Sequence, residues 1–438
     1  MQNIRKQKLT KVVLAALVGV SIMTTSLPKA EADFDVGSAI GAVLGVGIQY
    51  AQLSKQIAYY NSNEGRNKYM GDVKKQVGVN YDPTANAMLD RVMSRLSSAI
   101  AVEDPSIKKQ PYNHFVNDQK TFNAFCTLGH NMSVNIGLFD ILNYNEDELA
   151  FVVAHEMGHG QHNDPANGVK RTFPLSVLAA VASSQAGNIA EVIGVNILNN
   201  LGSAKLVTLP MEKKADEFAF DYAPKAGYNP GAGSAVWQRV IDKMGAGNKQ
   251  SFVGSIFNPS DHPGNISRRD TYSKDITAYS NNNVKVDGKT AVISVKNKAI
   301  GAPKAGASMS ALERAYLIAG NISTVYHDKL VTNPTASSDD SYVYLNDKAI
   351  MSLNSGDDAD TWVTNLNLAN RKKSDTSLTS KAVKTENATK TIKKDSKTTA
   401  TTTAPGSFRA KVEAERATVS AASFNTFIYI SSKIEFVL

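Results

Sequence analysis

Hydrophobic positions in the first half of the chain change from a helical to an extended period. From Ala85 to Ile100 they recur every three or four residues, which predicts an amphipathic helix. Residues 113–116 and 121–126 have the texture of short strands. The next segment alternates apolar with polar residues and predicts a half-exposed strand, whose apolar positions are Met132, Val134 and Ile136. We interpret this strand as a sheet edge, with an interior strand as the alternative.

Two further segments predict helices. Asn145, followed three residues later by a glutamate and then by an apolar pattern, is typical of a helix N-terminus. Pro210 begins a second helical pattern. In that helix Glu212 and Asp216 are four residues apart and therefore lie on one face.

The C-terminal third has a different pattern. Residues 284–300 and 342–353 each contain a strand–turn–strand pattern that closes on Lys-Ala-Ile. Residues 308–327, between them, have helical periodicity. We interpret residues 281–369 as a small α+β accessory module built from a degenerate repeat, with a coincidence of short turns as the alternative.

The two ends of the chain are unlike the rest. Residues 1–32 combine a basic start, an uncharged apolar run and small residues at 30 and 32, which predicts a signal peptide. Residues 36–54 contain no charged residue. They predict a packed amphipathic helix, with a membrane-contacting helix as the alternative. Residues 370–406, rich in threonine and lysine, predict a disordered linker. The C-terminal segment 407–438 has no pattern to which we assign a role.

Composition narrows the class of protein. The 438 residues are 42% hydrophobic and 20% charged, which is an ordinary globular balance. The net charge of +8 is concentrated in residues 1–32 (+4) and 371–397 (+6), so the remainder carries −2. This excludes a nucleic-acid binder by bulk charge. The single cysteine, Cys126, excludes an intramolecular disulfide.

The helix after Asn145 carries the motif His155-Glu156-Met157-Gly158-His159. Histidines four residues apart share one helical face, so both imidazoles can bind a single zinc ion. Glu156 is about 100° round the helix from His155, where it can take a proton from a zinc-bound water. Two ordinary helix histidines are the alternative.

A third ligand must come from elsewhere in the chain. An extended HExxHxxGxxH motif would need a histidine at position 165, where this chain has Pro165. Glu212 can complete a site of two histidines and one glutamate. Asp216, one turn later, can orient a ligand imidazole. Taken alone, this charged helix face would be interpreted as solvent-exposed.

These motifs, in this order, resemble the HtpX-like family of zinc metallopeptidases, which includes the CAAX prenyl proteases and the BepA-type and LoiP-type enzymes. The resemblance is closest to the exported LoiP type and covers about residues 69–279. It rests on Asn123-Ala124-Phe125, Gly137-Leu138, Asn145-Glu146-Asp147-Glu148-Leu149, the HExxH motif, Glu212 with Asp216, Ala226-Gly227-Tyr228-Asn229-Pro230, Asp261-His262-Pro263, Arg268 and Arg269.

The resemblance implies an α+β fold, namely a mostly helical gluzincin domain with a small active-site sheet, over residues 33–280. It implies one Zn²⁺ per chain, bound by His155, His159 and Glu212. It also implies Glu156 as the catalytic base and Asp216 as the residue that orients a ligand. His262 would lie over the cleft and either cap the zinc or stabilise the oxyanion, with an ordinary loop histidine as the alternative.

The function expected from these features is that of an exported zinc-dependent endopeptidase. Its expected partners are unfolded or misfolded proteins of the periplasm or cell envelope, with peripheral membrane contact through residues 36–54 as an option. An extended substrate would add to the strand of Met132, Val134 and Ile136 through backbone hydrogen bonds, and residues 281–369 would bind substrate or envelope. The alternative is a metal-containing envelope protein that binds its partners with little turnover.

Overall fold

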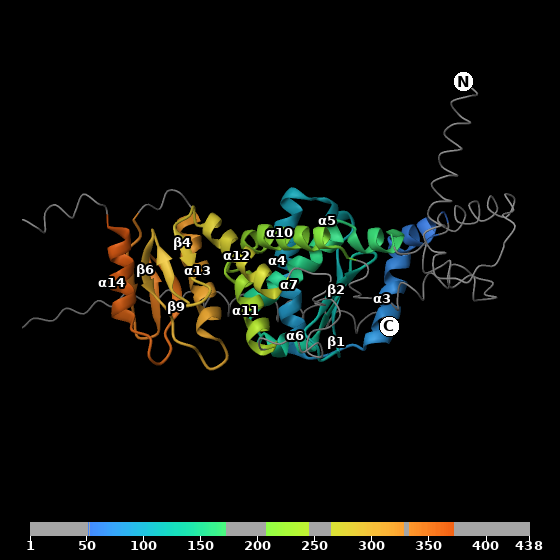
Figure 1. Ribbon diagram of the computed structural model, residues 1–438. Coiled ribbons are helices and arrows are strands. Elements are labelled where there is room, and N and C mark those ends of the chain that lie inside the picture. Colours follow the sequence, from blue (N-terminus) through green and yellow to red (C-terminus); the bar gives the residue numbers. More distant parts are fainter. Residues whose placement is uncertain (1–50, 52, 172–206, 245–263, 328–332, 372–438) are drawn as a thin grey trace, which may run out of the picture. The chain divides into compact units, whose positions relative to one another are not determined.

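The computed structural model describes residues 51, 53–171, 207–244, 264–327 and 333–371 (Figure 1). By internal contacts the chain divides into residues 1–373 and 374–438, and every described residue belongs to the first unit. The predicted signal peptide, the residues 36–50 and 52 of the predicted amphipathic helix, His262, and nearly all of the predicted linker and C-terminal segment lie outside the described residues.

Helices form most of the described N-terminal part. Residues 53–60 are helical, and α3 (Asn63–Val77), α4 (Pro83–Glu103) and α5 (Ser106–Lys109) follow. The side chain of Asp82 caps α4 by accepting a hydrogen bond from the backbone N–H of Ala85 at 2.7 Å. Helix α4 buries its predicted apolar face in the core around the HExxH helix.

The small sheet differs from the expectation. Its strands are β1 (Asn113–Asn117), β2 (Ala124–Thr127) and β3 (Asn131–Asn135), in the order β1-β3-β2. Strand β3 is parallel to β1 and antiparallel to β2, so it is central. The prediction that the strand of Met132 and Val134 is a half-exposed edge is therefore wrong, because all five residues of β3 are buried. Ile136 is not in the strand but begins α6 (Ile136–Ile141).

Buried hydrogen bonds explain why β3 alternates like an exposed strand. The amide of Asn117 on β1 donates to Ser133 Oγ and Asn135 Oδ1, both at 2.8 Å. The amide of Asn131 donates to the backbone carbonyl of Arg66 at 3.0 Å. The polar positions of β3 are thus satisfied inside the protein rather than by water.

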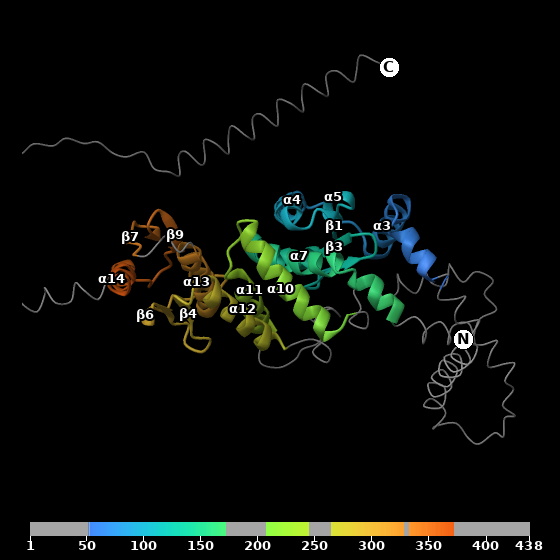
Figure 2. The ribbon, with the colours of Figure 1, turned by 90° about the horizontal axis from the view of Figure 1, so that it is seen from above.

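Two packed helices form the centre of the N-terminal part. Helices α7 (Glu146–Gln161) and α10 (Leu209–Lys225) lie side by side (Figures 1 and 2). Gly158 permits this close approach, because a Cβ at that position would lie 3.1 Å from the Ala215 Cα and from the Phe218 Cβ. Helices α11 (Ala232–Met244) and α12 (Asn265–Tyr279) pack against each other, and α11 also contacts α7.

The C-terminal described part consists of two similar halves. The first half has β4 (Val284–Val286), β5 (Ile293–Val295), β6 (Lys298–Gly301) and α13 (Ala311–His327). The second half has β7 (Ala336–Ser338), β8 (Tyr342–Leu345), β9 (Lys348–Ser352) and α14 (Ala359–Asn370). Each half is an antiparallel three-stranded meander followed by a helix, which confirms the predicted strand–turn–strand patterns.

The two halves share further details. Both sheets have a register shift at the same place, between Ile293 and Ser294 in one and between Val343 and Tyr344 in the other. Helix α13 packs on β4 and β9, and α14 packs on β6 and β7, so each helix joins both sheets. This arrangement agrees with a degenerate repeat.

A buried charge cluster joins this part to the HExxH helix. The guanidinium of Arg239 on α11 donates to the Glu148 carboxylate of α7 at 2.8 and 3.1 Å. Arg239 Nη2 also lies 2.5 Å from Glu313 Oε1 on α13. All three side chains are at most 2% exposed. Burial, together with the nearby charge of Glu148, raises the pKa of Glu313 to about 9, so the two carboxyls share a proton at neutral pH.

This cluster predicts a pH-dependent stability. Between about pH 4.5, the ordinary pKa of a glutamate, and about pH 9, the folded protein keeps a proton on Glu313 that the unfolded chain has released. The free energy of unfolding should therefore fall as pH rises through this window, by up to about 1.4 kcal/mol per pH unit from this group.

Urea unfolding between pH 5 and 9, comparing wild type with Glu313→Gln, measures the effect. The variant cannot titrate at this position, so its stability relative to wild type should rise with pH. Parallel curves for the two proteins across the window would show that Glu313 is ionised in the folded state.

Candidate active site

The first turn of α7 is fixed by contacts from several elements. The side chain of Asn145 accepts a hydrogen bond from the Glu148 backbone N–H at 3.1 Å, which confirms the predicted helix start. Glu146 accepts from Arg91 at 2.8 Å, and Asp147 accepts from the Asn229 backbone N–H at 3.0 Å. The Glu148 side chain binds Arg239 instead of closing a capping box. These contacts hold the N-terminal end of the HExxH helix.

One turn of each of two helices brings three possible metal ligands together. The Nε2 atoms of His155 and His159 are 3.2 Å apart, and they lie 3.4 and 3.3 Å from the two carboxylate oxygens of Glu212. The three side chains are buried. Zinc bonds of about 2.0–2.1 Å in tetrahedral geometry put neighbouring ligand atoms about 3.3 Å apart, so the spacing of these atoms fits a zinc ion.

A carboxylate lies behind each imidazole. Asp216 Oδ1 is 3.0 Å from His155 Nδ1, and Asp164 Oδ2 is 2.9 Å from His159 Nδ1. A hydrogen bond from each Nδ1 leaves each Nε2 directed toward Glu212. In the structure the Asp216 carboxylate thus contacts His155, one of the two histidines of the HExxH motif, whereas the sequence analysis did not point to Asp164. The available signal was Asp164-Pro165, which is typical of a helix start directly after the end of α7.

Helix α12 holds Asp216 in place. Arg268 donates from Nε to Asp216 Oδ2 at 2.8 Å and from Nη2 to Oδ1, and its guanidinium stacks 3.8 Å from the Trp237 ring centroid. The Tyr272 hydroxyl donates to Asp216 Oδ1 at 3.0 Å. Burial alone would raise the pKa of Asp216, but the charge of Arg268 and the hydrogen bond from His155 lower it to about 2. Asp216 is therefore ionised at neutral pH.

Glu156 faces the sheet rather than α10. Its Oε2 accepts a hydrogen bond from the Cys126 backbone N–H on β2 at 3.0 Å, and its side chain is buried. Burial raises the pKa of Glu156 above the ordinary value of a glutamate, which suits a residue that accepts a proton near neutral pH. The Cys126 thiol does not belong to the group of possible metal ligands found among the described residues, and burial raises its pKa well above normal.

The charges of the site favour a cation. Four buried carboxylates surround the two imidazoles: Glu156, Asp164, Glu212 and Asp216. Among the described residues, Arg268 is the positive side chain that contacts this group, at Asp216 and at 3.8 Å from Glu212. A divalent cation at the three ligand atoms would offset the excess of negative charge.

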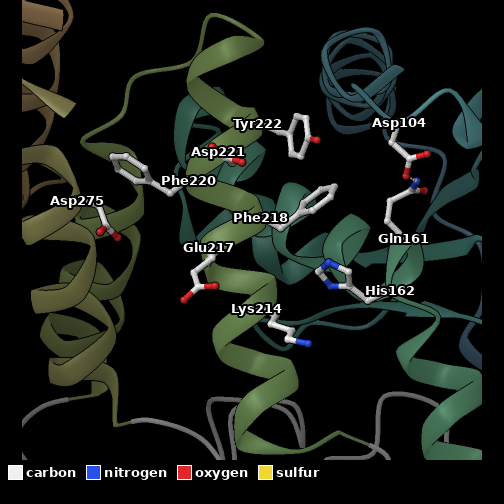
Figure 3. A pocket seen from close by; sticks show the side chains of 10 residues that line it. All are labelled: Asp104, Gln161, His162, Lys214, Glu217, Phe218, Phe220, Asp221, Tyr222 and Asp275. Carbon is white, nitrogen blue, oxygen red and sulfur yellow. Dashed lines mark hydrogen bonds between the residues drawn. The ribbon is translucent and has the colours of Figure 1, made fainter. Parts of the chain in front are cut away.

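A surface cavity lies on the other side of α10. It has a volume of about 590 Å³, and the residues of α10 that line it are Lys214, Glu217, Phe218, Phe220, Asp221 and Tyr222 (Figure 3). By helical spacing, all of these residues except Phe220 lie on the face opposite Glu212 and Asp216. His155, His159 and Glu212 do not line this cavity.

Comparison with known proteins assigns the domain that contains this cluster. Residues 83–275 match peptidase family M48. The chain carries a peptidase family M48 domain. This confirms the resemblance to zinc metallopeptidases at the level of the family, and it identifies the domain as that of a metalloendopeptidase. Peptidases of this family depend on a metal, usually zinc.

Individual relatives match over part of their length. Metalloprotease LoiP of Escherichia coli strain K12 is 29% identical over 44% of this chain and 73% of LoiP. The beta-barrel assembly-enhancing protease of the same strain is 24% identical over 54% of this chain and 47% of the relative. The mitochondrial metalloendopeptidase OMA1 of Saccharomyces cerevisiae is 26% identical over 40% of this chain and 51% of OMA1. The chain thus spans about half the length of two of these relatives.

Proposed function

We propose that this protein is an exported zinc-dependent endopeptidase that hydrolyses unfolded or misfolded proteins of the cell envelope. The observation that carries the proposal is the convergence of His155 Nε2, His159 Nε2 and the Glu212 carboxylate within an M48 domain, with Glu156 beside them. The domain supports peptide-bond hydrolysis, and the basic, apolar start of the chain supports export.

His155, His159 and Glu212 would hold the zinc. When bound there, zinc would polarise the scissile carbonyl and make a water molecule more acidic. Glu156 would accept the proton from that water and deliver it to the departing amine. The Cys126 N–H fixes the orientation of the Glu156 carboxylate, and burial of that carboxylate favours proton transfer near neutral pH. Asp216 and Arg268 keep the His155 ring in position.

The envelope location rests on the signal-peptide pattern and on the relatives. LoiP is named as a metalloprotease, and the second relative from Escherichia coli is named as a protease that enhances β-barrel assembly. None of the helices in the described ranges is both long enough and apolar enough to span a bilayer. We propose that the protein works in the periplasm or at the envelope surface, on protein substrates rather than nucleic acids.

We further propose that the substrate adds to β2 and not to β3. The Asn135 backbone N–H donates to the carbonyl of Asn123, just before β2, at 3.0 Å, so in the alternating ladder the backbone groups of Ala124 and Cys126 point away from β3. Cys126 directs its N–H to Glu156, which places this outer side of β2 beside the catalytic base. An extended substrate segment that pairs with this side of β2 would run past the HExxH helix. Its affinity would come from backbone hydrogen bonds and would depend little on its sequence.

Ala124→Pro tests this placement. Proline removes the outward N–H of Ala124, a buried residue, and is tolerated on edge strands. Loss of one substrate hydrogen bond should raise KM for unfolded casein about 2–10-fold with a small change in kcat. Circular dichroism and zinc content serve as controls for the fold. An unchanged KM in a folded, zinc-loaded variant would contradict substrate pairing at this position.

Hydrolysis of casein by the purified protein tests the proposed function itself. We expect cleavage that a zinc chelator stops and added zinc restores. If the zinc-loaded protein binds unfolded proteins but cleaves none of them, the protein is a binding factor of the envelope instead.

A further inference from the structure

We infer that Asp164 is a positioning residue that fixes the His159 imidazole for metal binding. The inference rests on the proposed zinc site and adds a residue outside the HExxH motif and the Glu212–Asp216 pair. Its basis is the 2.9 Å contact between Asp164 Oδ2 and His159 Nδ1, with each side chain 6% exposed.

A two-residue break between helical stretches brings Asp164 to this contact. Helix α7 ends at Gln161, and the His162 backbone N–H still bonds to the Gly158 carbonyl at 3.0 Å. Asn163 adopts a left-handed conformation with φ of 55°, a conformation that asparagine tolerates better than most residues. The next helical stretch, residues 164–171, starts immediately and holds Asp164 against the face of α7 that carries His159.

The contact has the chemistry of a ligand-orienting hydrogen bond. A histidine that binds a metal through Nε2 needs its proton on Nδ1, and a carboxylate acceptor fixes both that tautomer and the ring orientation. The His159 Nε2 is in fact directed to the Glu212 carboxylate at 3.3 Å. Asp164 therefore does for His159 what Asp216 does for His155.

The two carboxylates differ in what else they contact. Asp216 shares its charge with the Arg268 guanidinium, which binds both of its oxygens. The ring of His159 separates Asp164 from the metal position, and the side-chain hydrogen bond of Asp164 within the described residues is the one to His159. In the part of the chain that the structure describes, no guanidinium binds Asp164, so its carboxylate behind His159 would favour a bound cation.

Zinc affinity, measured by competition with a chromophoric chelator, tests the inference without relying on catalysis. We expect Asp164→Asn and Asp164→Ala to weaken zinc binding about 10–100-fold. The zinc-free variants should unfold in urea close to the zinc-free wild type. Asp140→Asn, at an exposed position on α6, is the matched control and should bind zinc like wild type.

Asp216→Asn provides a second comparison. It should lose zinc affinity and also stability in the zinc-free state, because it leaves the buried Arg268 without its carboxylate. Equal zinc affinity of wild type and both Asp164 variants would overturn the role of Asp164, while the proposed function would stand if wild type still cleaves casein. A wild-type protein that binds no zinc would overturn both.

Discussion

Glu156→Gln is expected to abolish most hydrolysis while zinc and the fold remain. Glutamine has nearly the same size as glutamate and can still accept the Cys126 N–H, but it cannot take a proton from water at neutral pH. Loss of a general base lowers rates by roughly 10²–10⁴-fold. Elemental analysis for zinc, beside initial rates on casein, measures both quantities on the same preparation.

Changes at the ligands should have a different result. His155→Ala or Glu212→Ala leaves two of the three converging side chains, so zinc and activity should be lost together. His162→Ala is a suitable control, because His162 lies on the same helix end but is exposed. It should keep both zinc and activity. Full activity of Glu156→Gln, or wild-type zinc affinity of Glu212→Ala, would contradict the assigned roles.

The site could be predicted to the extent that its residues follow helical spacing. His155 with His159, and Glu212 with Asp216, are pairs four residues apart whose shared face is a local property of a helix. The position of Asp164 could have been predicted in the same way, because its contact with His159 depends only on where α7 ends and the next helix starts. Arg268 was different, because its contact with Asp216 joins residues 52 positions apart.

The sheet shows the limit of a pattern. Alternation of polar and apolar residues in β3 has two physical origins, exposure to water or a buried polar face with internal hydrogen bonds. In this protein the internal hydrogen bonds come from the amide of Asn117 on β1. The sequence of β3 alone does not show that β1 lies beside it. The local pattern predicted a strand correctly and its surroundings wrongly.

The accessory part also has a role that the sequence did not indicate. Binding of substrate or envelope by residues 281–369 stays a prediction. The structure adds contacts with the HExxH helix and its neighbours. Glu313 reaches Arg239, and the Asn229 side chain donates to the Leu317 carbonyl at 2.9 Å. Close packing accompanies these contacts, because a Cβ at Gly320 would lie 2.2 Å from the Gly231 nitrogen.

Arg239→Met is expected to be the most destabilising single change in this region. The guanidinium joins Glu148 of α7 to Glu313 of α13, and its Nη1 donates to the Ser308 carbonyl at 3.2 Å. Methionine would leave two carboxyls buried without their cation, for which the expected loss in free energy of unfolding is about 3–5 kcal/mol. Arg91→Met, which removes an exposed arginine from Glu146 of the same helix, is the control and should cost at most about 1 kcal/mol.

A triple variant separates the charge from the packing. If Arg239→Met is combined with Glu148→Leu and Glu313→Leu, no buried charge is left unpaired, and most of the lost stability should return. Urea unfolding with zinc in fixed excess measures all four proteins. A loss no larger than that of Arg91→Met would show that the cluster is solvated in the folded protein. If casein hydrolysis falls in Arg239→Met and recovers in the triple variant, α13 contributes to catalysis by holding the start of the HExxH helix.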